Sequence, residues 1–226
     1  MEKETALKII EKNRESYNNI AKEFDASRQY SWLEFDLCAP YIKKESNILD
    51  IGCGNGRLYE HLITNYKLLI TKYTGVDQSE ELIKIAQKNY PDTNFKTIKD
   101  VRRLQFEDGE FDFIAGIAFL HHIPDGEMRL EVLKEVYRVL APGGTLFLIN
   151  WNLWQWRLIK KYKLHLRDFF YQHNDLDAGD FWINFQGTPR YYHHFTKSGL
   201  VRLCKKAGFK LLSCKKGKNM ILVLSK

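Results

Sequence analysis

The sequence predicts an α/β fold in which a seven-stranded, mostly parallel sheet carries helices on both faces. Three observations support this class. Short apolar segments alternate with amphipathic segments along most of the chain, as parallel strands joined by crossover helices require. A glycine-rich stretch directly follows the first apolar segment. Two late strand-like segments are separated only by a turn, which predicts an antiparallel hairpin added at one edge of the sheet.

The bulk composition agrees with one α/β domain. The chain has 226 residues, of which 44% are hydrophobic, so a substantial core can form. It contains no run of about 18 apolar residues, so no membrane span is expected. Its start lacks the apolar segment of a secretory signal. The cysteines show no C-x-x-C spacing, which favours reduced thiols in a cytoplasmic protein over a metal site. They are Cys38, Cys53, Cys204 and Cys214.

The first elements are a helix, a strand and a second helix. Residues 5–24 place apolar side chains at helical spacing, so we expect a helix there. Residues 47–51 form a short apolar strand that runs into glycines. Residues 57–66 repeat apolar side chains one turn apart and should form the helix after that strand.

The middle of the chain continues the alternation. Residues 73–77 are a strand, and Ser79 after it is a good N-cap for a helix that must stop before Pro91. Residues 94–98 are the third strand. Residues 111–117 are apolar on both faces, as a central parallel strand should be.

The later elements are a clear helix, three strands and a capped helix. Residues 128–140 carry apolar side chains at i, i+3, i+4 and i+7, which predicts a helix that residues 141–144 (Ala-Pro-Gly-Gly) end. A strand at 145–150 precedes a long aromatic and basic insert at about 154–194. The elements expected after the insert are a helix over 197–207, capped by Thr196 and ended by Gly208, and strands at 210–214 and 220–224.

The glycine-rich stretch predicts a ligand loop. It has the spacing G-x-G-x-G at Gly52, Gly54 and Gly56, and Asp50 precedes it. Glycines permit a sharp strand-to-helix turn and let a ligand approach the backbone closely. The spacing differs from the G-x-G-x-x-G that seats a pyrophosphate. An acid beside the loop favours a ligand with a cationic group, although a plain tight turn is an alternative.

Two further acids end the next two predicted strands. Asp77 ends the second strand, where a carboxylate can accept hydrogen bonds from both ribose hydroxyls. Asp100 follows the third strand and could accept from an adenine amine. Either could instead cap a helix or lie in solvent. Together with Asp50, three acids at one edge of the sheet fit a nucleoside with a cationic amino-acid tail.

Residues 46–150 resemble the class I S-adenosylmethionine-dependent methyltransferases, which have a Rossmann-like fold. The segments that carry the resemblance are Asp50 to Gly56, Gly75 to Asp77, Asp100-Val101, Phe111-Asp112, Leu120-His121-His122 and Pro142-Gly143-Gly144. The resemblance implies that the glycine loop lines the methionine part, that Asp77 holds the ribose, and that Asp100 and Val101 meet the adenine. The core residues expected to bind the cofactor are Asp50, Gly52, Cys53, Gly54, Gly56, Asp77, Gln78, Asp100, Val101 and Ile117.

The flanks are similar to the wobble-uridine tRNA methyltransferases, which esterify a carboxymethyl group on uridine C5. Before the core stands Y-x-x-I-A-x-x-F-x-x-x-R-x-x-x-W, from Tyr17 to Trp32, and after it stands R-Y-Y-H, from Arg190 to His193. The resemblance implies that Tyr17 and Arg28 reach the cofactor's carboxylate, with Arg28 as a two-pronged donor. It also implies a tRNA substrate and, as in many members, a small zinc-binding activator subunit.

The substrate side is predicted from the same flanks. Arg190, Tyr191, Tyr192 and His193 could bind an anionic substituent on uracil or stack on a base, and His122 could contact the substrate or handle a proton. The candidate catalytic residues are His122, Arg190, Tyr191 and His193. The alternatives are loop packing for the histidine and a structural aromatic cluster for the others. A carboxylate is already nucleophilic at neutral pH, so transfer needs alignment and desolvation more than a base.

The positive charge is concentrated late in the chain. From Trp151 onward there are fifteen Lys or Arg against four Asp or Glu, a net of +11, which leaves −4 for the first 150 residues out of a total of +7. Residues 154–167 interleave tryptophans with lysines and arginines, as a nucleic-acid contact does. An amphipathic helix with inward aromatics and solvated lysines is the alternative.

We therefore expect one methyltransferase domain over 1–226, with four segments. They are a helical cofactor-covering segment (1–45), the cofactor-binding core (46–150), an aromatic and basic substrate insert (151–195), and a helix with a hairpin (196–226). Two rival functions share the same core motifs. One is methylation of a small molecule such as a quinone, a lipid or a secondary metabolite. The other is a non-catalytic cofactor-binding partner subunit.

Overall fold

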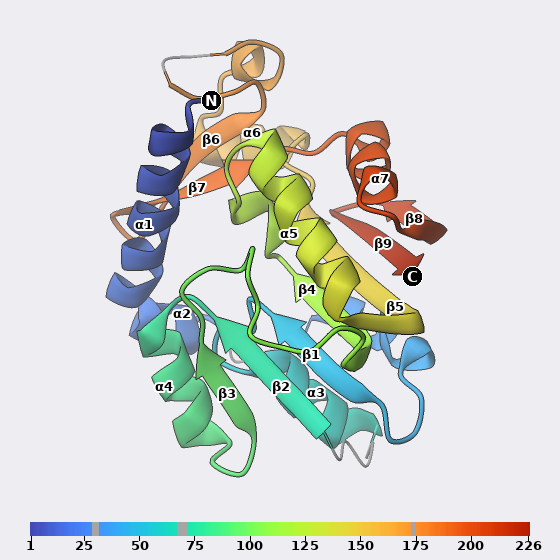
Figure 1. Cartoon of the computed structure of the whole chain (residues 1–226). Coiled ribbons are helices and arrows are strands. Elements are labelled where there is room, and N and C mark those ends of the chain that lie inside the picture. The colour runs from blue at the N-terminus through green and yellow to red at the C-terminus, as the bar shows by residue number, and fades with distance from the viewer. Residues whose placement is uncertain (29–31, 67–71, 173–174) are drawn as a thin grey trace.

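The computed structural model describes residues 1–28, 32–66, 72–172 and 175–226 (Figure 1). Residues 29–31 of the predicted N-terminal flanking motif and residues 173–174 of the predicted insert lie outside the described residues. Across the described ranges, no helix is both long enough and apolar enough to cross a bilayer.

Seven of the described strands form one sheet in the order β3-β2-β1-β4-β5-β9-β8. Neighbours from β3 to β5 are parallel, and β9 runs antiparallel to both β5 and β8. The predicted fold class is therefore confirmed, including the hairpin at one edge. The strands are β1 (Asn47–Ile51), β2 (Lys72–Asp77), β3 (Asn94–Thr97), β4 (Phe111–Ile117), β5 (Leu140–Trp151), β8 (Lys210–Lys216) and β9 (Asn219–Ser225).

Helices cover both faces of this sheet because its strands are apolar on both sides. On one face, Leu146 and Leu148 of β5 pack with α5 (Gly126–Val139) and α7 (Lys197–Lys206). On the other face, Phe147 and Ile149 pack with α3 (Arg57–Tyr66), α4 (Glu80–Asn89) and the 3₁₀ helix η1 (Leu33–Leu37). Successive strand side chains point to opposite faces, so one strand supplies both cores.

Two predicted helix caps are present. The Ser79 hydroxyl accepts a hydrogen bond from the Leu82 backbone N–H at 3.2 Å at the start of α4. The Thr196 hydroxyl accepts from the Gly199 N–H at 3.1 Å at the start of α7. Each cap satisfies one of the backbone donors that a helix leaves unpaired at its first turn. Gly208, expected to end α7, has a positive φ of 108°.

Two boundary predictions were wrong. The single helix expected over 5–24 divides at Ile20 into α1 (Lys3–Asn19) and α2 (Ala21–Ala26). Residues 141–144, expected as a helix end and turn, belong to β5, and α5 already ends at Val139. Leu140 completes the apolar pattern of the helix but pairs with Phe111 as a strand residue. Periodicity alone could not distinguish these roles, because Leu140 is buried in either.

The insert folds into elements that the sequence did not predict individually. It contains α6 (Trp156–Tyr162), the 3₁₀ helix η4 (Leu166–Phe169) and a hairpin of β6 (Asp180–Phe185) and β7 (Thr188–His193). These elements share a small apolar core of their own. Gln186 and Gly187 make the hairpin turn with φ values of 50° and 84°, which suit a tight two-residue turn.

Helix α1 lies along β7, as Figure 1 shows. The Ser16 hydroxyl donates a hydrogen bond to the Pro189 carbonyl at 2.7 Å. The Asn13 side-chain oxygen accepts from the Tyr191 backbone N–H at 3.0 Å. The helix thus satisfies backbone groups at the edge of the hairpin, and the N-terminal segment and the insert are packed together.

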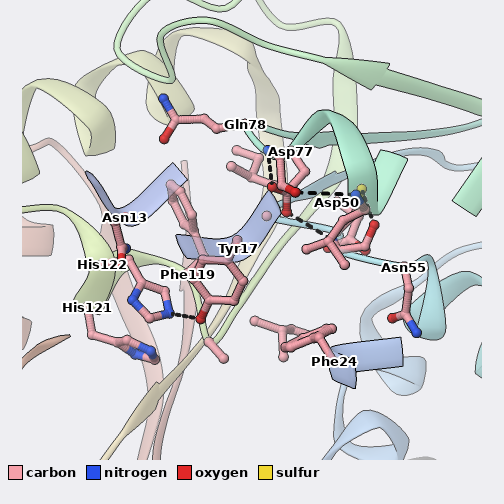
Figure 2. Close-up of a pocket in the computed structure, with 18 of the residues that line it drawn as sticks. Asn13, Tyr17, Phe24, Asp50, Asn55, Asp77, Gln78, Phe119, His121 and His122 are labelled. Carbon is pink, nitrogen blue, oxygen red and sulfur yellow. Dashed lines mark hydrogen bonds between the residues drawn. The ribbon is translucent and has the colours of Figure 1, made fainter. Parts of the chain in front are cut away.

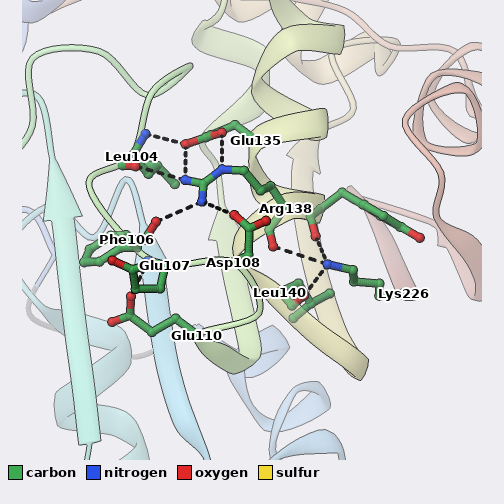
Figure 3. A network of polar contacts seen from close by, with 10 residues as sticks. Leu104, Phe106, Glu107, Asp108, Glu110, Glu135, Arg138, Leu140 and Lys226 are labelled. Atoms are coloured by element: carbon green, nitrogen blue, oxygen red, sulfur yellow. Dashed lines mark hydrogen bonds and ion pairs between the residues drawn. The ribbon is translucent and has the colours of Figure 1, made fainter.

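An ionic network ties the loop before β4 to α5 (Figure 3). The Arg138 guanidinium donates to the Phe106 carbonyl at 2.9 Å and to the Asp108 carboxylate at 2.6 Å. Glu135 binds the same guanidinium at 2.8 Å and accepts from the Leu104 N–H at 2.7 Å. Hydrogen bonds to Glu135 and Asp108 raise the pKa of Arg138. The network holds in place the loop that leads into β4, the central strand.

Candidate functional site

A pocket opens at the carboxyl ends of β1, β2 and β4, where ligands bind in doubly wound sheets. Figure 2 shows Tyr17 and Phe24 of the N-terminal helices over this pocket, with Asp50 and Asp77 on one side and His122 on the other. The N-terminal helices thus cover the strand ends. The pocket has a side formed by the core of the sheet and a side formed by β7.

The glycine loop forms the floor of the core side. Gly52 and Gly54 have φ values of 73° and 56°, a region that side chains rarely tolerate. A Cβ on Gly52 would lie 3.0 Å from the Phe119 Cβ. The N–H groups of Gly52 and Cys53 both donate to the Val76 carbonyl, at 2.8 and 3.1 Å. The loop is therefore held against β2 with its backbone exposed to the pocket.

Asp77 lies beside this loop at the end of β2. One carboxylate oxygen accepts from the Gly54 N–H at 3.0 Å, and the other accepts from the Ser79 N–H at 2.8 Å. Burial raises the pKa of Asp77, although these backbone hydrogen bonds oppose the shift. Asp77 lines the pocket, where its remaining lone pairs can accept from ligand hydroxyls.

Asp50 is the second buried acid on this side. It is 2% exposed and accepts a hydrogen bond from the Tyr73 hydroxyl at 2.7 Å. Burial raises the pKa of Asp50 to about 7, against the opposing effect of the Tyr73 hydrogen bond. A cation bound in the pocket would be stabilised by the ionised form of this carboxylate.

Not every predicted cofactor residue lines the pocket. Cys53, Gln78, Val101, Ile117 and Arg28 do, with Tyr17, Asp50, Gly52, Gly54 and Asp77. Gly56 and Asp100 do not. Asp100 is instead bound at two points by Arg102, whose Nε and Nη2 atoms lie 2.9 and 2.8 Å from its oxygens. This partner, two residues further along, lowers the pKa of Asp100 despite its partial burial.

The core side fits S-adenosylmethionine. Asp50 and Asp77 supply two carboxyl groups near the exposed loop backbone, and apolar Ile98 and Val101 line the same pocket. A ligand with a ribose, an apolar base and a positive centre matches this set. Arg28 also lines the pocket and can hold the ligand's carboxylate. Burial and then repulsion from Arg190 lower the pKa of Arg28.

Arg190 lines the β7 side of the pocket. Its side chain is 2% exposed, and its Nη1 donates to the Tyr17 hydroxyl at 3.2 Å. The rings of Tyr17, Phe185 and Tyr192 surround the guanidinium, with centroids 5.3, 4.7 and 5.4 Å away. Among the described residues no carboxylate pairs with it, and its buried Nε has no hydrogen-bond partner. A buried guanidinium in that state calls for an anionic ligand.

Only two of the four candidate catalytic residues line the pocket. Arg190 and His122 line the pocket, whereas Tyr191 and His193 do not. The Tyr191 hydroxyl and the His193 Nδ1 atom both bond the buried carboxylate of Asp180, at 2.6 and 2.7 Å. Side chains alternate across a strand, so the R-Y-Y-H segment presents only its first and third residues to the pocket. As placed, Tyr191 and His193 support the hairpin and do not reach a ligand there.

Tyr192, the third residue of that segment and one of those expected to bind the anionic substituent, lines the pocket. Its ring stacks against those of Trp151 and His121, with a centroid separation of 5.2 Å to each. The Gln186-Gly187 pair could have shown that Tyr192 shares a face with Arg190, because a hairpin turn there fixes which residues of β7 lie on the same side. Asn13 was missed, and its helical spacing from Tyr17 was the available signal.

Comparison with known proteins identifies relatives of this chain. Residues 49–148 match the methyltransferase domain family. A protein of Encephalitozoon cuniculi named as a methyltransferase is 30% identical over 197 residues, covering 87% of this chain and 86% of its own. The tRNA (carboxymethyluridine(34)-5-O)-methyltransferase of Schizosaccharomyces pombe is 28% identical over 214 residues, covering 87% of each chain.

Solved structures show the same architecture. A SAM-dependent methyltransferase from Methanosarcina mazei aligns with a TM-score of 0.69 at 28% identity, covering 84% of this chain and 96% of its own. A chain from the complex between the Haloferax volcanii Trm112 activator and a methyltransferase aligns with a TM-score of 0.70 at 14% identity, covering 94% and 96%. At that identity, the second match shows the fold alone.

Proposed function

This chain belongs to the S-adenosylmethionine-dependent methyltransferase family, and we propose that it methylates the carboxylate of a carboxymethyl group on the wobble uridine of tRNA, in the cytoplasm. The E. cuniculi relative and the M. mazei structure carry the family assignment. The S. pombe relative supports the substrate, because its name gives that reaction.

The buried guanidinium of Arg190 is the observation that carries the choice of acceptor. S-adenosylmethionine has one carboxylate, and we assign it to Arg28 because Arg28 lines the pocket. Arg190 is one of the other arginines that line this pocket, and it is 2% exposed and without a carboxylate partner among the described residues. A second anion, on the acceptor, would satisfy it. A neutral hydroxyl or amine acceptor would leave the buried charge uncompensated.

The surrounding residues suit a reaction that needs no base. When bound, S-adenosylmethionine supplies a methyl group that a carboxylate oxygen takes as the bond to sulfur breaks and its electron pair stays on sulfur, so no proton moves. Arg190 would orient the carboxylate, and the rings around it would exclude water. Burial lowers the pKa of His122 to about 3, so this imidazole is neutral at physiological pH. It can fix neighbouring groups without titrating.

The surface of residues 154–171, from α6 to η4, supports an RNA partner. Its exposed aromatic side chains are Trp154, Trp156, Phe170 and Tyr171, which are 42, 64, 64 and 70% exposed. The same span has five Lys or Arg and one Asp. Lys160 lies over the Trp156 ring at 5.0 Å. Exposed rings that stack on bases and cations that meet phosphates are the usual means of binding unpaired RNA.

This surface adjoins the β7 side of the pocket. Tyr162 at the end of α6 packs against the apolar cluster that contains Tyr192, and Tyr192 lines the pocket. A nucleotide held on the 154–171 surface could therefore present its modified base to Arg190. The resemblance of the flanks also leads us to propose that a small zinc-binding activator assists the enzyme.

Methyl-labelled S-adenosylmethionine and bulk tRNA from a strain lacking the wobble-uridine methyltransferase provide the test. The chain is assayed alone and with a zinc-binding activator of the Trm112 type. Alkali-labile label in the wobble uridine is the expected result, since a methyl ester hydrolyses in alkali. Alkali-stable label in RNA would contradict carboxylate transfer. An absence of label under both conditions, with cofactor binding confirmed, would favour a small-molecule substrate, or a non-catalytic subunit if no metabolite is labelled either.

A further inference from the structure

The hydroxyl of Tyr17 joins three elements that are distant in the sequence. Tyr17 lies on α1, His122 follows β4, and Arg190 lies on β7. The Tyr17 oxygen is 2.9 Å from the His122 Nε2 atom and accepts from the Arg190 Nη1 atom at 3.2 Å. All three residues line the pocket. The resemblance to the tRNA methyltransferases implies that Tyr17 binds the cofactor's carboxylate, and these contacts test that assignment.

The direction of each hydrogen bond follows from the partners. The His122 Nδ1 atom lies 2.8 Å from the Tyr191 carbonyl oxygen, which can only accept, so Nδ1 carries the proton. Burial keeps the imidazole neutral, so its Nε2 atom has no proton and can only accept. Tyr17 must therefore donate its one hydroxyl proton to His122.

Because Tyr17 donates its one hydroxyl proton to His122, it cannot also donate a hydrogen bond to a carboxylate. A carboxylate only accepts hydrogen bonds, so binding one through Tyr17 would require its proton. His122 Nε2 would then be buried without a partner, which is unfavourable. The lone pairs of Tyr17 remain available and already bind the Arg190 guanidinium. The hydroxyl is therefore directed at a cation and serves the β7 side of the pocket.

We propose that Tyr17 is a positioning residue for the acceptor, holding Arg190 through one guanidinium nitrogen so that its buried Nε edge receives the substrate carboxylate. The inference rests on the proposed function and assigns Tyr17 to the acceptor, not to the cofactor. Nη1 is used by Tyr17, and the three rings around the guanidinium restrict its other orientations. The Nε and Nη2 atoms can then bind a carboxylate at two points.

The variant Tyr17→Phe separates the two assignments, because it removes only the hydroxyl and keeps the ring against Phe24 and His122. We expect the KM for 5-carboxymethyluridine, or its Kd with S-adenosylhomocysteine present, to rise about tenfold, as for a lost hydrogen bond to a charged group. The kcat and the Kd of S-adenosylhomocysteine should change less than about twofold. A tenfold rise in that second Kd with unchanged acceptor binding would overturn the proposal.

A double variant tests whether Tyr17 acts through Arg190. If it does, Tyr17→Phe should add little to the acceptor defect of Arg190→Lys, whereas independent roles would give additive losses. Thermal unfolding of each variant checks its folding. A readout without substitution is also available: S-adenosylhomocysteine should leave the ¹⁵N shift of His122 Nε2 unchanged in the wild-type chain. A large shift would mean that Tyr17 now donates its hydrogen bond to the ligand's carboxylate and no longer to His122, which would overturn the proposal.

Failure of the proposed function would be distinguishable from failure of this inference. The two S-adenosylhomocysteine measurements need no acceptor, so they decide which side of the pocket Tyr17 serves. If the wild-type chain neither binds nor methylates the carboxymethyl nucleoside or its tRNA, the proposed function is wrong and the acceptor assignment of Tyr17 falls with it. If it does so with Tyr17→Phe equal to wild type, only the inference is wrong.

Discussion

The Tyr17 hydroxyl lies 2.9 Å from the His122 Nε2 atom, and this contact links the first helix to the end of the central strand. Since the His122 Nδ1 atom donates to a backbone carbonyl, the contact fixes one tautomer of the imidazole. A neutral histidine with a fixed tautomer is a hydrogen-bonding group and not a proton carrier in the physiological range.

His122 should therefore stay neutral across the range in which histidines ordinarily titrate. Burial lowers its pKa to about 3, so its ¹⁵N signals should show a protonated Nδ1 and change little between pH 5 and 8. Histidine-selective NMR spectra measure this directly, with a histidine-containing peptide in the same buffers as reference. A titration near pH 6.5 would contradict the assigned hydrogen bonds.

Asp77→Ala should weaken S-adenosylhomocysteine binding about 100-fold, because the buried carboxylate would no longer accept hydrogen bonds from the two ribose hydroxyls. Asp100→Ala is the matched control. Its carboxylate is bound by Arg102 and does not line the pocket, so a change below about threefold is expected. Isothermal titration calorimetry gives both values. Equal losses would return Asp100 to the cofactor site.

Cofactor affinity should rise as the pH rises through about 7. Burial raises the pKa of Asp50 to about 7, and a positively charged cofactor favours its ionised form. The Kd of S-adenosylmethionine should then be about tenfold higher at pH 6 than at pH 8. Asp50→Asn removes this difference but keeps the titration of the cofactor's own amino group, which is common to both proteins. An identical pH profile for the two would refute the assignment.

The same shift affects folding. The folded chain holds the Asp50 proton more tightly than the unfolded chain does. This contribution to stability is therefore fully present below about pH 4, the ordinary aspartate value, and is lost as the pH rises through about 7. Urea unfolding at pH 5 and pH 8 should show a smaller loss of stability with rising pH in Asp50→Asn than in the wild-type chain. No difference between the two proteins would contradict the shift.

Reversal of two charges on α6 should weaken RNA binding. Lys160→Glu with Lys161→Glu should lower tRNA affinity by about tenfold or more and reduce the salt slope by about 1.5, as for two lost phosphate contacts. Cofactor affinity should not change. The exposed pair on α7, Lys205→Glu with Lys206→Glu, is the control of equal charge. Equal effects of the two pairs would indicate general charge attraction and not a docking surface.

Asp180→Ala should destabilise the chain by about 2–4 kcal/mol, because the Tyr191 hydroxyl and His193 imidazole both lose their buried acceptor. Asp108→Ala is the control, since that carboxylate is 82% exposed although it pairs with Arg138. Its effect should stay below about 1 kcal/mol. Denaturant unfolding measures both. A small effect at Asp180 would show that the hairpin is not anchored there.

Much of the cofactor site was predictable because it depends on local rules. A strand followed by G-x-G-x-G must turn sharply, and Asp77 must lie at the carboxyl end of its strand. Asp50, Gly52, Gly54 and Asp77 accordingly lie together on the pocket wall. Asp100 was expected at the end of the third strand, just as Asp77 was expected at the end of the second. Its nearby partner Arg102 binds its carboxylate, and sequence position could not show that.

The sequence by itself determined the α/β fold class, the glycine loop and the acids at the strand ends, because periodicity and turn chemistry act over a few residues. Only the tertiary structure decided that Arg190 faces the pocket while Tyr191 turns to Asp180, since strand alternation has meaning only once the hairpin packs on α1. It also decided the role of Tyr17. The direction of a hydroxyl's hydrogen bond depends on the groups that folding brings beside it, and here those groups lie 105 and 173 residues away.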